Sequence, residues 1–198
     1  MSRVRLCVVF VAGLLTACSV NESDAARRTD LAPSMQWDHT SKGTDWTKTA
    51  MAALRDHGMP LASTVPDDIE AYCPGYKTAS TEERQAFWVG LLSSLSKHES
   101  TWRETAVGGG GRWYGLFQIS PGTARAYGCE AKSGKALLDG AKNVNCAIRI
   151  MSHTVPRDNV ISQGMRGVAA DWGPFHSSSK RKDIMGWTRS QPYCQAKG

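Results

Sequence analysis

The chain has 198 residues, of which 41% are hydrophobic and 21% charged, and its formal net charge is +6. These values are typical of a globular protein, and the length favours one domain over two. We find no internal repeat, which excludes a repeat protein, and no low-complexity run except the glycines at residues 108–111. The mild basic excess indicates an anionic polymer as partner, whereas Lys180-Arg181-Lys182 is interpreted as a solvated loop and not as a nucleic-acid site.

The first residues form a segment of another kind. Arg3 and Arg5 precede a nearly unbroken apolar stretch over residues 6–15, which is too short to cross a bilayer of about 30 Å as a helix. This pattern predicts a secretory signal peptide over residues 1–17. Without its two arginines the chain keeps 22 basic against 18 acidic residues, a net charge of about +4.

The end of this segment predicts a lipid anchor. Residues 15–18, Leu-Thr-Ala-Cys, resemble a bacterial lipobox, in which Cys18 is lipidated and becomes the first mature residue. The alternative is ordinary cleavage near Ala25. The polar residues that follow predict a flexible tether over residues 18–43. Ser19 favours sorting to the outer membrane of a two-membrane bacterium, which places the protein in the periplasm.

Four cysteines follow the signal peptide: Cys73, Cys129, Cys146 and Cys194. An even number in an exported chain favours two disulfides, and no C-x-x-C pair or His/Cys cluster has zinc spacing. Three pairings are possible. We favour Cys129 with Cys146, which closes a short loop, and Cys73 with Cys194, which fastens the C-terminal tail.

Apolar periodicity predicts a helical domain over residues 44–198. Its first helix is expected over residues 46–57, ended by Gly58 and Pro60. After a turn at residues 73–76, the next helix is expected to begin with Thr81 as N-cap, followed by two acids in the first turn, where the helix dipole favours negative charge.

This second helix should run to about Glu99. Its apolar face includes Trp88, Leu92 and Leu95, and adding four residues to Leu95 gives Glu99, so its carboxylate is expected to point inward. Apolar surroundings raise the pKa of a carboxyl, as a general acid working near neutral pH requires. The alternative is an ordinary helix-end acid whose head reaches solvent.

The glycines at residues 108–111 lack the following Lys-Ser or Lys-Thr of a phosphate loop and predict a mobile loop. Residues 112–120 predict an extended or irregular segment. The rings of Tyr114 and Phe117 can stack on sugars and the Gln118 amide can bind their polar groups, although a core loop explains this composition equally well.

The remaining segments also have helical periodicity. A helix is expected to begin at Ser120-Pro121, because proline is tolerated in the first turn. Another is expected around residues 145–152, with breaks at residues 139–140 and 156–158. A last helical stretch leads from Gly164 toward Gly173-Pro174, which is expected to end it.

Four motifs then occur in a shared order. Glu99-Ser100, Gly-Leu-Phe-Gln-Ile at residues 115–119, a helix start at residues 143–151 and Ala-Ala-Asp-Trp-Gly-Pro at residues 169–174 are similar to those of the soluble lytic transglycosylase domain. The resemblance covers about residues 80–176. It implies a mainly α, lysozyme-like fold of the goose type with a glycan cleft, Glu99 as the catalytic residue, and substrate contacts from Ser100, Tyr114, Phe117, Gln118, Asp171 and Trp172.

The resemblance also implies a reaction. Enzymes of this family cleave the β-1,4 bond between N-acetylmuramic acid and N-acetylglucosamine in peptidoglycan and leave 1,6-anhydro ends, with one glutamate as acid and then base. No metal or cofactor is implied, and we expect a monomer. The chain departs from the family where Asp171-Trp172 replaces Tyr-Asn and the motif is one residue shorter, and where Phe117 replaces methionine.

Two alternatives remain open at this point. Asp171 can act as a base for water, which would make the protein a lysozyme-like hydrolase with two carboxylates. A non-catalytic lipoprotein that anchors itself to peptidoglycan through the cleft is the other alternative. Glu99 separates these hypotheses, since a binding module does not require a buried acid.

Overall fold

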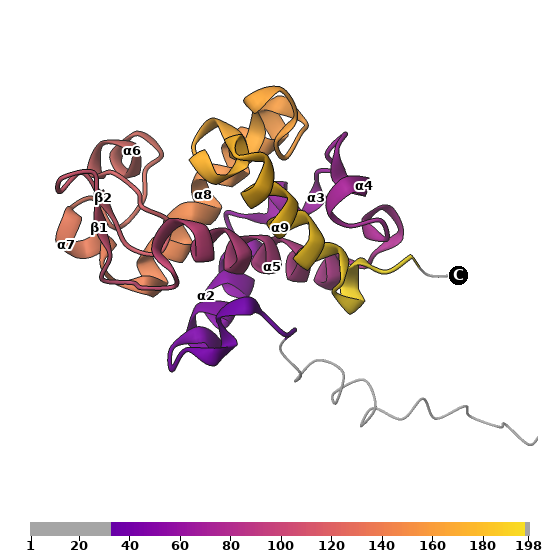
Figure 1. Cartoon of the computed structure of the whole chain (residues 1–198), viewed down its shortest axis with the longest axis horizontal. Helices are drawn as coiled ribbons and strands as arrows, with labels where there is room; N and C mark the ends of the chain where they lie inside the picture. Colours follow the sequence, from indigo (N-terminus) through magenta and orange to yellow (C-terminus); the bar gives the residue numbers. More distant parts are fainter. Residues whose placement is uncertain (1–32, 197–198) are drawn as a thin grey trace, which may run out of the picture. The chain divides into compact units, whose positions relative to one another are not determined.

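The computed structural model describes residues 33–196, which form a mainly helical fold with one short β-hairpin (Figure 1). The predicted signal peptide, Cys18 and most of the predicted tether lie outside the described residues. Within residues 33–196, no helix has both the length and the apolar character that crossing a bilayer requires. The predicted fold class, mainly α with little β-structure, is confirmed.

The elements follow one another closely along the chain. The α-helices are α2 (Gly43–Arg55), α3 (Met59–Ser63), α4 (Ile69–Tyr72), α5 (Thr81–Ser100), α6 (Pro121–Ala126), α7 (Gly134–Leu137), α8 (Gly140–Asp158) and α9 (Ser178–Arg189). The 3-10 turns are η1 (Gln36–His39), η2 (Tyr76–Thr78), η3 (Gln163–Met165), η4 (Gly167–Ala170), η5 (Gly173–His176) and η6 (Pro192–Cys194). Strands β1 (Val107–Gly108) and β2 (Trp113–Tyr114) pair antiparallel.

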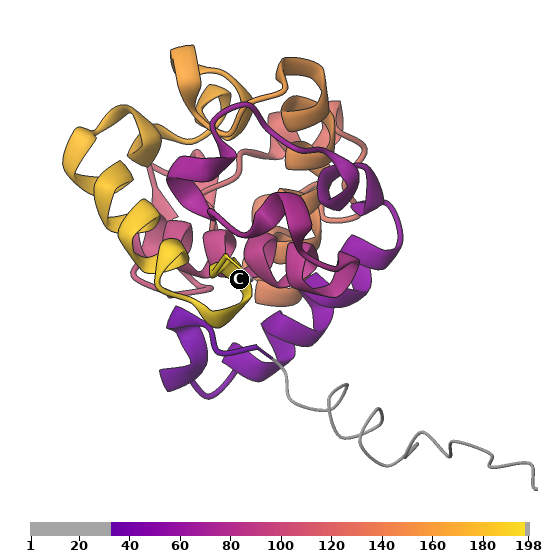
Figure 2. The same cartoon turned by 90° about the vertical axis from the view of Figure 1, so that its right-hand side faces the viewer.

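Helix α5 is central, because α2, α3, α9, η1, η5 and η6 all contact it. Figure 2 shows the N-terminal helices in indigo and the C-terminal helix α9 in yellow on different sides of the magenta segment that contains α5. Every residue from Gln85 to Ser96 is buried. The sequence predicted that only one face of this helix is buried, but the middle of α5 is buried on all sides.

Two buried serines in the middle of α5 donate their hydroxyls to carbonyls of the same helix, whereas the Ser94 hydroxyl has no partner among the described residues. Ser93 Oγ donates to the Gly90 carbonyl at 2.8 Å and Ser96 Oγ to the Ser93 carbonyl at 3.0 Å. Small side chains also permit close packing: a Cβ on Gly90 would lie 2.3 Å from the Tyr193 hydroxyl. A serine-rich stretch that reads as polar thus forms part of the core.

The start of α5 differs from the prediction by one residue. Ser80, not Thr81, is the N-cap, and its Oγ accepts from the Glu83 amide at 3.2 Å. The Glu83 carboxylate accepts in turn from the Ser80 amide at 2.8 Å, which completes a capping box. Ser80 is chosen because Glu83 lies three residues after it, whereas Thr81 has Arg84 at that spacing.

Two helices end within a few residues of the predicted breaks, α2 at Arg55 and α8 at Asp158, but the prolines do not end them. Pro60 lies in the first turn of α3, where its missing N–H costs little, and it does not end the preceding helix. Pro156 lies inside α8, which continues to Asp158 and ends with Asn159 in the left-handed conformation. A proline in the last turn removes one hydrogen bond of a long helix that is already buried against α2, α3 and η4.

The predicted helix before Gly173 is wrong. The chain forms two 3-10 turns, η3 and η4, separated by Arg166, and Gly173-Pro174 begins η5 instead of ending a helix. Gly167 explains the interruption, because its φ of 63° is left-handed and a Cβ there would lie 1.9 Å from the Val160 carbonyl oxygen.

The end of the predicted tether belongs to the packed domain. Trp37, in η1, is fully buried, and its Nε1 donates to Thr47 Oγ1 in α2 at 2.8 Å. Trp37 also packs edge-on against Trp46, with ring centroids 5.7 Å apart. The folded domain therefore begins before residue 44, where the sequence interpretation placed it.

The two predicted disulfides are confirmed. Cys73 pairs with Cys194, 121 residues away, and Cys129 pairs with Cys146, 17 residues away. The first fastens the C-terminal η6 beside the turn before η2, where the Gly75 amide also donates to the Cys194 carbonyl at 2.9 Å. The second joins the end of α6 to α8. Both stabilise mainly by restricting the unfolded chain.

Candidate active site

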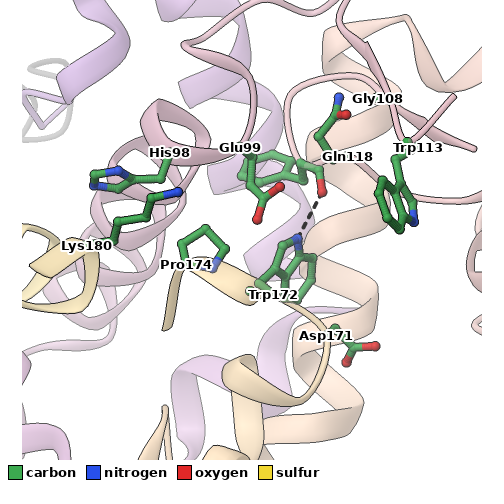
Figure 3. Close-up of a pocket in the computed structure, with 12 residues that line it drawn as sticks. His98, Glu99, Gly108, Trp113, Gln118, Asp171, Trp172, Pro174 and Lys180 are labelled. Atoms are coloured by element: carbon green, nitrogen blue, oxygen red, sulfur yellow. Dashed lines mark hydrogen bonds between the residues drawn. The ribbon is translucent and has the colours of Figure 1, made fainter. Parts of the chain in front are cut away.

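A cleft of about 530 Å³ opens where α5 ends. It is lined by the last turn of α5, the β1–β2 hairpin, the loop before α6, the segment from Asp171 to Pro174 and the first turn of α9 (Figure 3). Its lining residues are His98, Glu99, Gly108, Gly109, Trp113, Phe117, Gln118, Asp171, Trp172, Gly173, Pro174 and Lys180. Five of the predicted site residues are among them. The volume is in the range of small-ligand sites.

Glu99 lies in this cleft, as its helical phase predicts. Its carboxyl group points toward the turn that carries Pro174 and Trp172 (Figure 3). Burial raises the pKa of Glu99 to about 7, while the charge of Lys180 acts in the opposite direction. Within residues 33–196 we find no hydrogen bond or ion pair to this carboxyl group. It is therefore a half-buried acid whose proton is available to a molecule in the cleft.

The end of α5 is fixed immediately after Glu99. Thr101 and Trp102 adopt left-handed φ values of 54° and 56°, which stop the helix. The Trp102 indole then folds back, and its Nε1 donates to the Ser93 carbonyl at 2.8 Å. Two non-glycine residues in this conformation are strained, and this strain marks a segment whose position is set by its surroundings.

The Gly-Leu-Phe-Gln loop is held opposite Glu99 by a buried amide. Asn143, in α8, accepts from the Phe117 amide at 2.9 Å and donates to the carbonyls of Tyr114 and Leu137 at 3.0 and 2.9 Å. Gly115 makes this possible, because a Cβ there would lie 2.4 Å from the Asn143 amide nitrogen. The loop motif and the start of α8 thus form one structural unit.

Phe117 and Gln118 follow in the same loop. Phe117 is fully buried and forms part of the cleft wall. Gln118 has a left-handed φ of 48°, and its Nε2 donates to the carbonyls of Ala106 and Gly115 at 3.2 and 2.9 Å. Its amide therefore joins the loop to the base of the hairpin while one side of it faces the cleft.

Gly108 ends β1 and pairs with Trp113, and the glycines at residues 109–111 belong to the tip of the β1–β2 hairpin, which the sequence did not predict. Gly109, Gly110 and Gly111 have φ values of 58°, 65° and 89°. A Cβ on Gly109 would lie 2.3 Å from the ring of Trp113. Glycine is required here because the backbone packs directly on this indole, which is 44% exposed and lines the cleft.

Trp172 and Asp171 form the opposite wall. Trp172 is only 3% exposed, and its Nε1 donates to the Phe117 carbonyl at 3.0 Å. In Figure 3 its indole lies between Glu99 and Asp171. Burial raises the pKa of Asp171, whereas Arg157 lowers it and Asp158 raises it. Asp171 also lines a smaller extension of the cleft toward Ser120 and Thr123.

Two predicted substrate contacts are not brought into the cleft. Ser100 is buried, and its Oγ donates to the Ser96 carbonyl at 3.2 Å. Tyr114 donates from its hydroxyl to the Gly111 carbonyl at 2.5 Å, and its ring packs on Gly134. Neither side chain is among those that line the cleft, where the neighbouring residues Glu99 and Trp113 form the lining.

Three cleft residues were missed by the sequence interpretation. Trp113, His98 and Lys180 line the cleft although none was named as a contact. Strand alternation could have indicated Trp113, because successive side chains of a strand point to opposite faces and Trp113 is the neighbour of Tyr114. Lys180 had no such indication, since it comes from α9, beyond every motif. Within residues 33–196, no group of three or more His, Cys, Asp or Glu side chains is arranged to hold a metal ion.

Comparison with known proteins agrees with the helical fold. Residues 78–162 match the family described as "Transglycosylase SLT domain". The wild-type structure of Bd0314 DslA has a TM-score of 0.76 and 29% identity, covering 84% of this chain and 100% of that one. Two DslA variants, each with a glutamate changed to glutamine, give TM-scores of 0.76 and 0.75 at 29% and 28% identity, with the same coverage. No curated protein matches the chain.

Proposed function

We propose that this chain, which belongs to the transglycosylase SLT family of lysozyme-like proteins, is a lytic transglycosylase that uses Glu99 as its general acid and base. The SLT domain implies peptidoglycan as the substrate. The observation that carries the residue assignment is the carboxyl group of Glu99, which lies in the cleft with a pKa of about 7. Near neutral pH a large fraction of it is protonated.

The proposed reaction has two steps. Protonated Glu99 first donates its proton to the glycosidic oxygen between N-acetylmuramic acid and N-acetylglucosamine, and the bond to C1 of the muramic acid breaks through an oxocarbenium-like transition state. The Glu99 carboxylate then accepts the proton of the C6 hydroxyl of the same muramic acid while that oxygen bonds to C1. The product is a 1,6-anhydro end, and Glu99 is protonated again.

One carboxyl group is enough for this reaction because the substrate supplies its own nucleophile. Glycosidases that use water require a second carboxylate, either as base or as nucleophile. Asp171 is the available candidate, since it lines the same cleft. Its position on the far side of the Trp172 indole from Glu99 favours the transglycosylase over the hydrolase (Figure 3).

The products distinguish these functions. Purified sacculi would be digested with the wild type, Glu99→Gln and Asp171→Asn, and the released muropeptides weighed by mass spectrometry. We expect products one water lighter than reducing sugars from the wild type and from Asp171→Asn, and almost none from Glu99→Gln. Reducing ends alone, lost in Asp171→Asn, would instead assign a hydrolase. No release by the wild type would leave a peptidoglycan-binding lipoprotein.

We also propose that the protein acts in the periplasm, anchored to the outer membrane through Cys18. The support is the signal-like N-terminus with its lipobox-like sequence, together with two disulfides, which persist in oxidising compartments. Metabolic labelling with a fatty acid tests the anchor: label is expected in the wild type and absent from Cys18→Ala. Label retained in the variant would contradict it.

A further inference from the structure

A lysine without a protein partner stands beside Glu99. Lys180, in the first turn of α9, lines the same cleft, and its side chain extends along His98 with the ammonium end on the side where Glu99 lies (Figure 3). Within residues 33–196 we find no ion pair or side-chain hydrogen bond to its Nζ. Lys180 therefore presents an unneutralised positive charge to any molecule bound there.

Asp183 is the acid whose position on α9 would allow it to pair with Lys180, and it contacts other residues instead. Asp183 lies three residues later on α9, at a spacing where helix side chains pair. Its Oδ2 is already 2.8 Å from Lys97 Nζ and 2.8 Å from His98 Nε2, both at the end of α5. This contact ties α9 to the helix that carries Glu99. Asp183 therefore contacts α5 and not Lys180, and the charge of Lys180 can act on a molecule in the cleft.

The substrate of an SLT domain carries charges of the opposite sign. Each muramic acid of peptidoglycan bears a lactyl group, which ends either in a free carboxylate or in a stem peptide with its own carboxylates. A polymer of N-acetylglucosamine has no carboxylate. We propose that Lys180 is a specificity-determining residue that binds the carboxylate carried by the muramic acid beside Glu99. This inference rests on the proposed function of the cleft.

The proposal has a consequence for the catalytic proton. The charge of Lys180 lowers the pKa of Glu99 against the effect of burial. A substrate carboxylate on Lys180 offsets that charge, so the pKa of Glu99 rises when the correct substrate binds, and the proton is retained for donation. A neutral glycan does not offset the charge of Lys180, so it does not raise the pKa of Glu99. Recognition of the substrate and protonation of the acid are thereby coupled.

Binding measurements test the proposal without requiring turnover. In the Glu99→Gln background, calorimetry would compare Lys180 with Lys180→Ala and Lys180→Arg, and with Lys182→Ala as a matched control, because Lys182 is exposed on α9 outside the cleft. The probes are peptide-bearing glycan strands, strands stripped of peptide by an amidase, and N-acetylglucosamine oligosaccharides.

We expect Lys180→Ala to lose about fivefold in affinity for carboxylate-bearing strands, as for a solvent-exposed ion pair, and to bind the neutral oligosaccharide as before. Lys180→Arg and Lys182→Ala should bind like the parent, and high salt should remove the difference. Loss on stripped strands assigns the lactyl carboxylate, and loss only on peptide-bearing strands assigns the stem peptide. Equal loss on the neutral glycan, or no loss on any strand, would overturn the proposal.

The pH profile gives a second readout that a purely structural role would not change. In the otherwise wild-type enzyme, Lys180→Ala should move the alkaline limb of kcat/KM to higher pH, because the charge that lowers the pKa of Glu99 is gone. An unmoved or lowered limb would contradict the proposal. If the wild type had no lytic activity, the proposed function would fail while the binding contrast could still be measured.

Discussion

Two acids line the cleft, and they come from different kinds of structure. Glu99 is on the last turn of α5, a helix that is buried in its middle and contacted by most neighbouring elements. Asp171 is on a short turn between η4 and η5, at the exposed rim. The charge of Lys180 acts on Glu99, whereas those of Arg157 and Asp158 act on Asp171.

This difference shows how one cleft can assign separate roles to two carboxyl groups. The helix fixes the direction of Glu99 and removes it from water, which raises its pKa into the range useful for donating a proton. The turn leaves Asp171 on the exposed rim, where partial burial still raises its pKa and the charge of Arg157 opposes that rise. Each of the following predictions tests this contrast between a proton donor and a rim acid.

The largest expected effect is on turnover by Glu99→Gln. The amide keeps the shape of the side chain but has no proton to donate, and general acid–base catalysis contributes about 10²- to 10⁴-fold. We expect the rate of muropeptide release to fall by about this factor while the circular dichroism spectrum is unchanged. A variant with undiminished turnover would remove Glu99 from the mechanism.

The second prediction concerns the stability of the same variant. Because the folded-state pKa of Glu99 lies above its value in the unfolded chain, the wild type loses stability as the pH rises from 4.5 to about 7. Glu99→Gln escapes this loss, so its free energy of unfolding should exceed that of the wild type by about 3 kcal/mol at pH 8. At pH 4 the two should be nearly equal.

Urea unfolding at several pH values measures this difference. Glu82→Gln is a suitable control, since Glu82 is an exposed acid in the first turn of the same helix. It should show no gain that grows with pH. If the Glu99 variant gained nothing at pH 8, the burial of a charged Glu99 would carry no cost and the contrast with Asp171 would fail.

A third prediction concerns the indole between the two acids. Trp172→Phe removes the donor to the Phe117 carbonyl, a buried acceptor. We expect a loss of about 2 kcal/mol in the free energy of unfolding, the usual effect of leaving a buried group without its partner. Activity should fall as well, because the Gly-Leu-Phe-Gln loop loses a support. Unchanged unfolding in denaturant would show that Asn143 alone positions the loop.

The smallest expected effect is that of Asp171→Asn. If Asp171 is only a rim acid, the variant should retain turnover within about threefold, the effect of less than 1 kcal/mol, and should release the same anhydro products. Muropeptide release rates and masses measure both. A loss as large as that of Glu99→Gln would place Asp171 in the reaction and equalise the two acids.

The direction of the Glu99 side chain was predictable because it depends on helical phase alone. Glu99 lies four residues after Leu95 and therefore on the same face of the helix. The disulfide pairing was predictable from loop length and the position of the tail. Asn143 was recognised as part of a motif, but its three hydrogen bonds to residues around the Gly-Leu-Phe-Gln loop were not, because they join segments 26, 29 and 6 residues apart in a geometry that spacing does not encode.

The rest of the site depends on tertiary contacts. Lys180 comes from a helix outside all four motifs, and Asp183, three residues later on the same helix, contacts α5 instead. Ser100 and Tyr114 were predicted as substrate contacts from their neighbours in the motifs, but one bonds within its own helix and the other braces the hairpin. A sequence motif can indicate which segment lines the site. The direction of each side chain in that segment depends on tertiary packing.

The pKa of Glu99 is the most direct test of the account. The protein would be labelled with carbon-13 at the glutamate carboxyl, and the resonance absent from Glu99→Gln would be titrated by NMR. We predict a midpoint of about 7, well above the ordinary value of 4.5. A midpoint near 4.5 would mean that Glu99 is charged at neutral pH, and it would contradict its assignment as the proton donor.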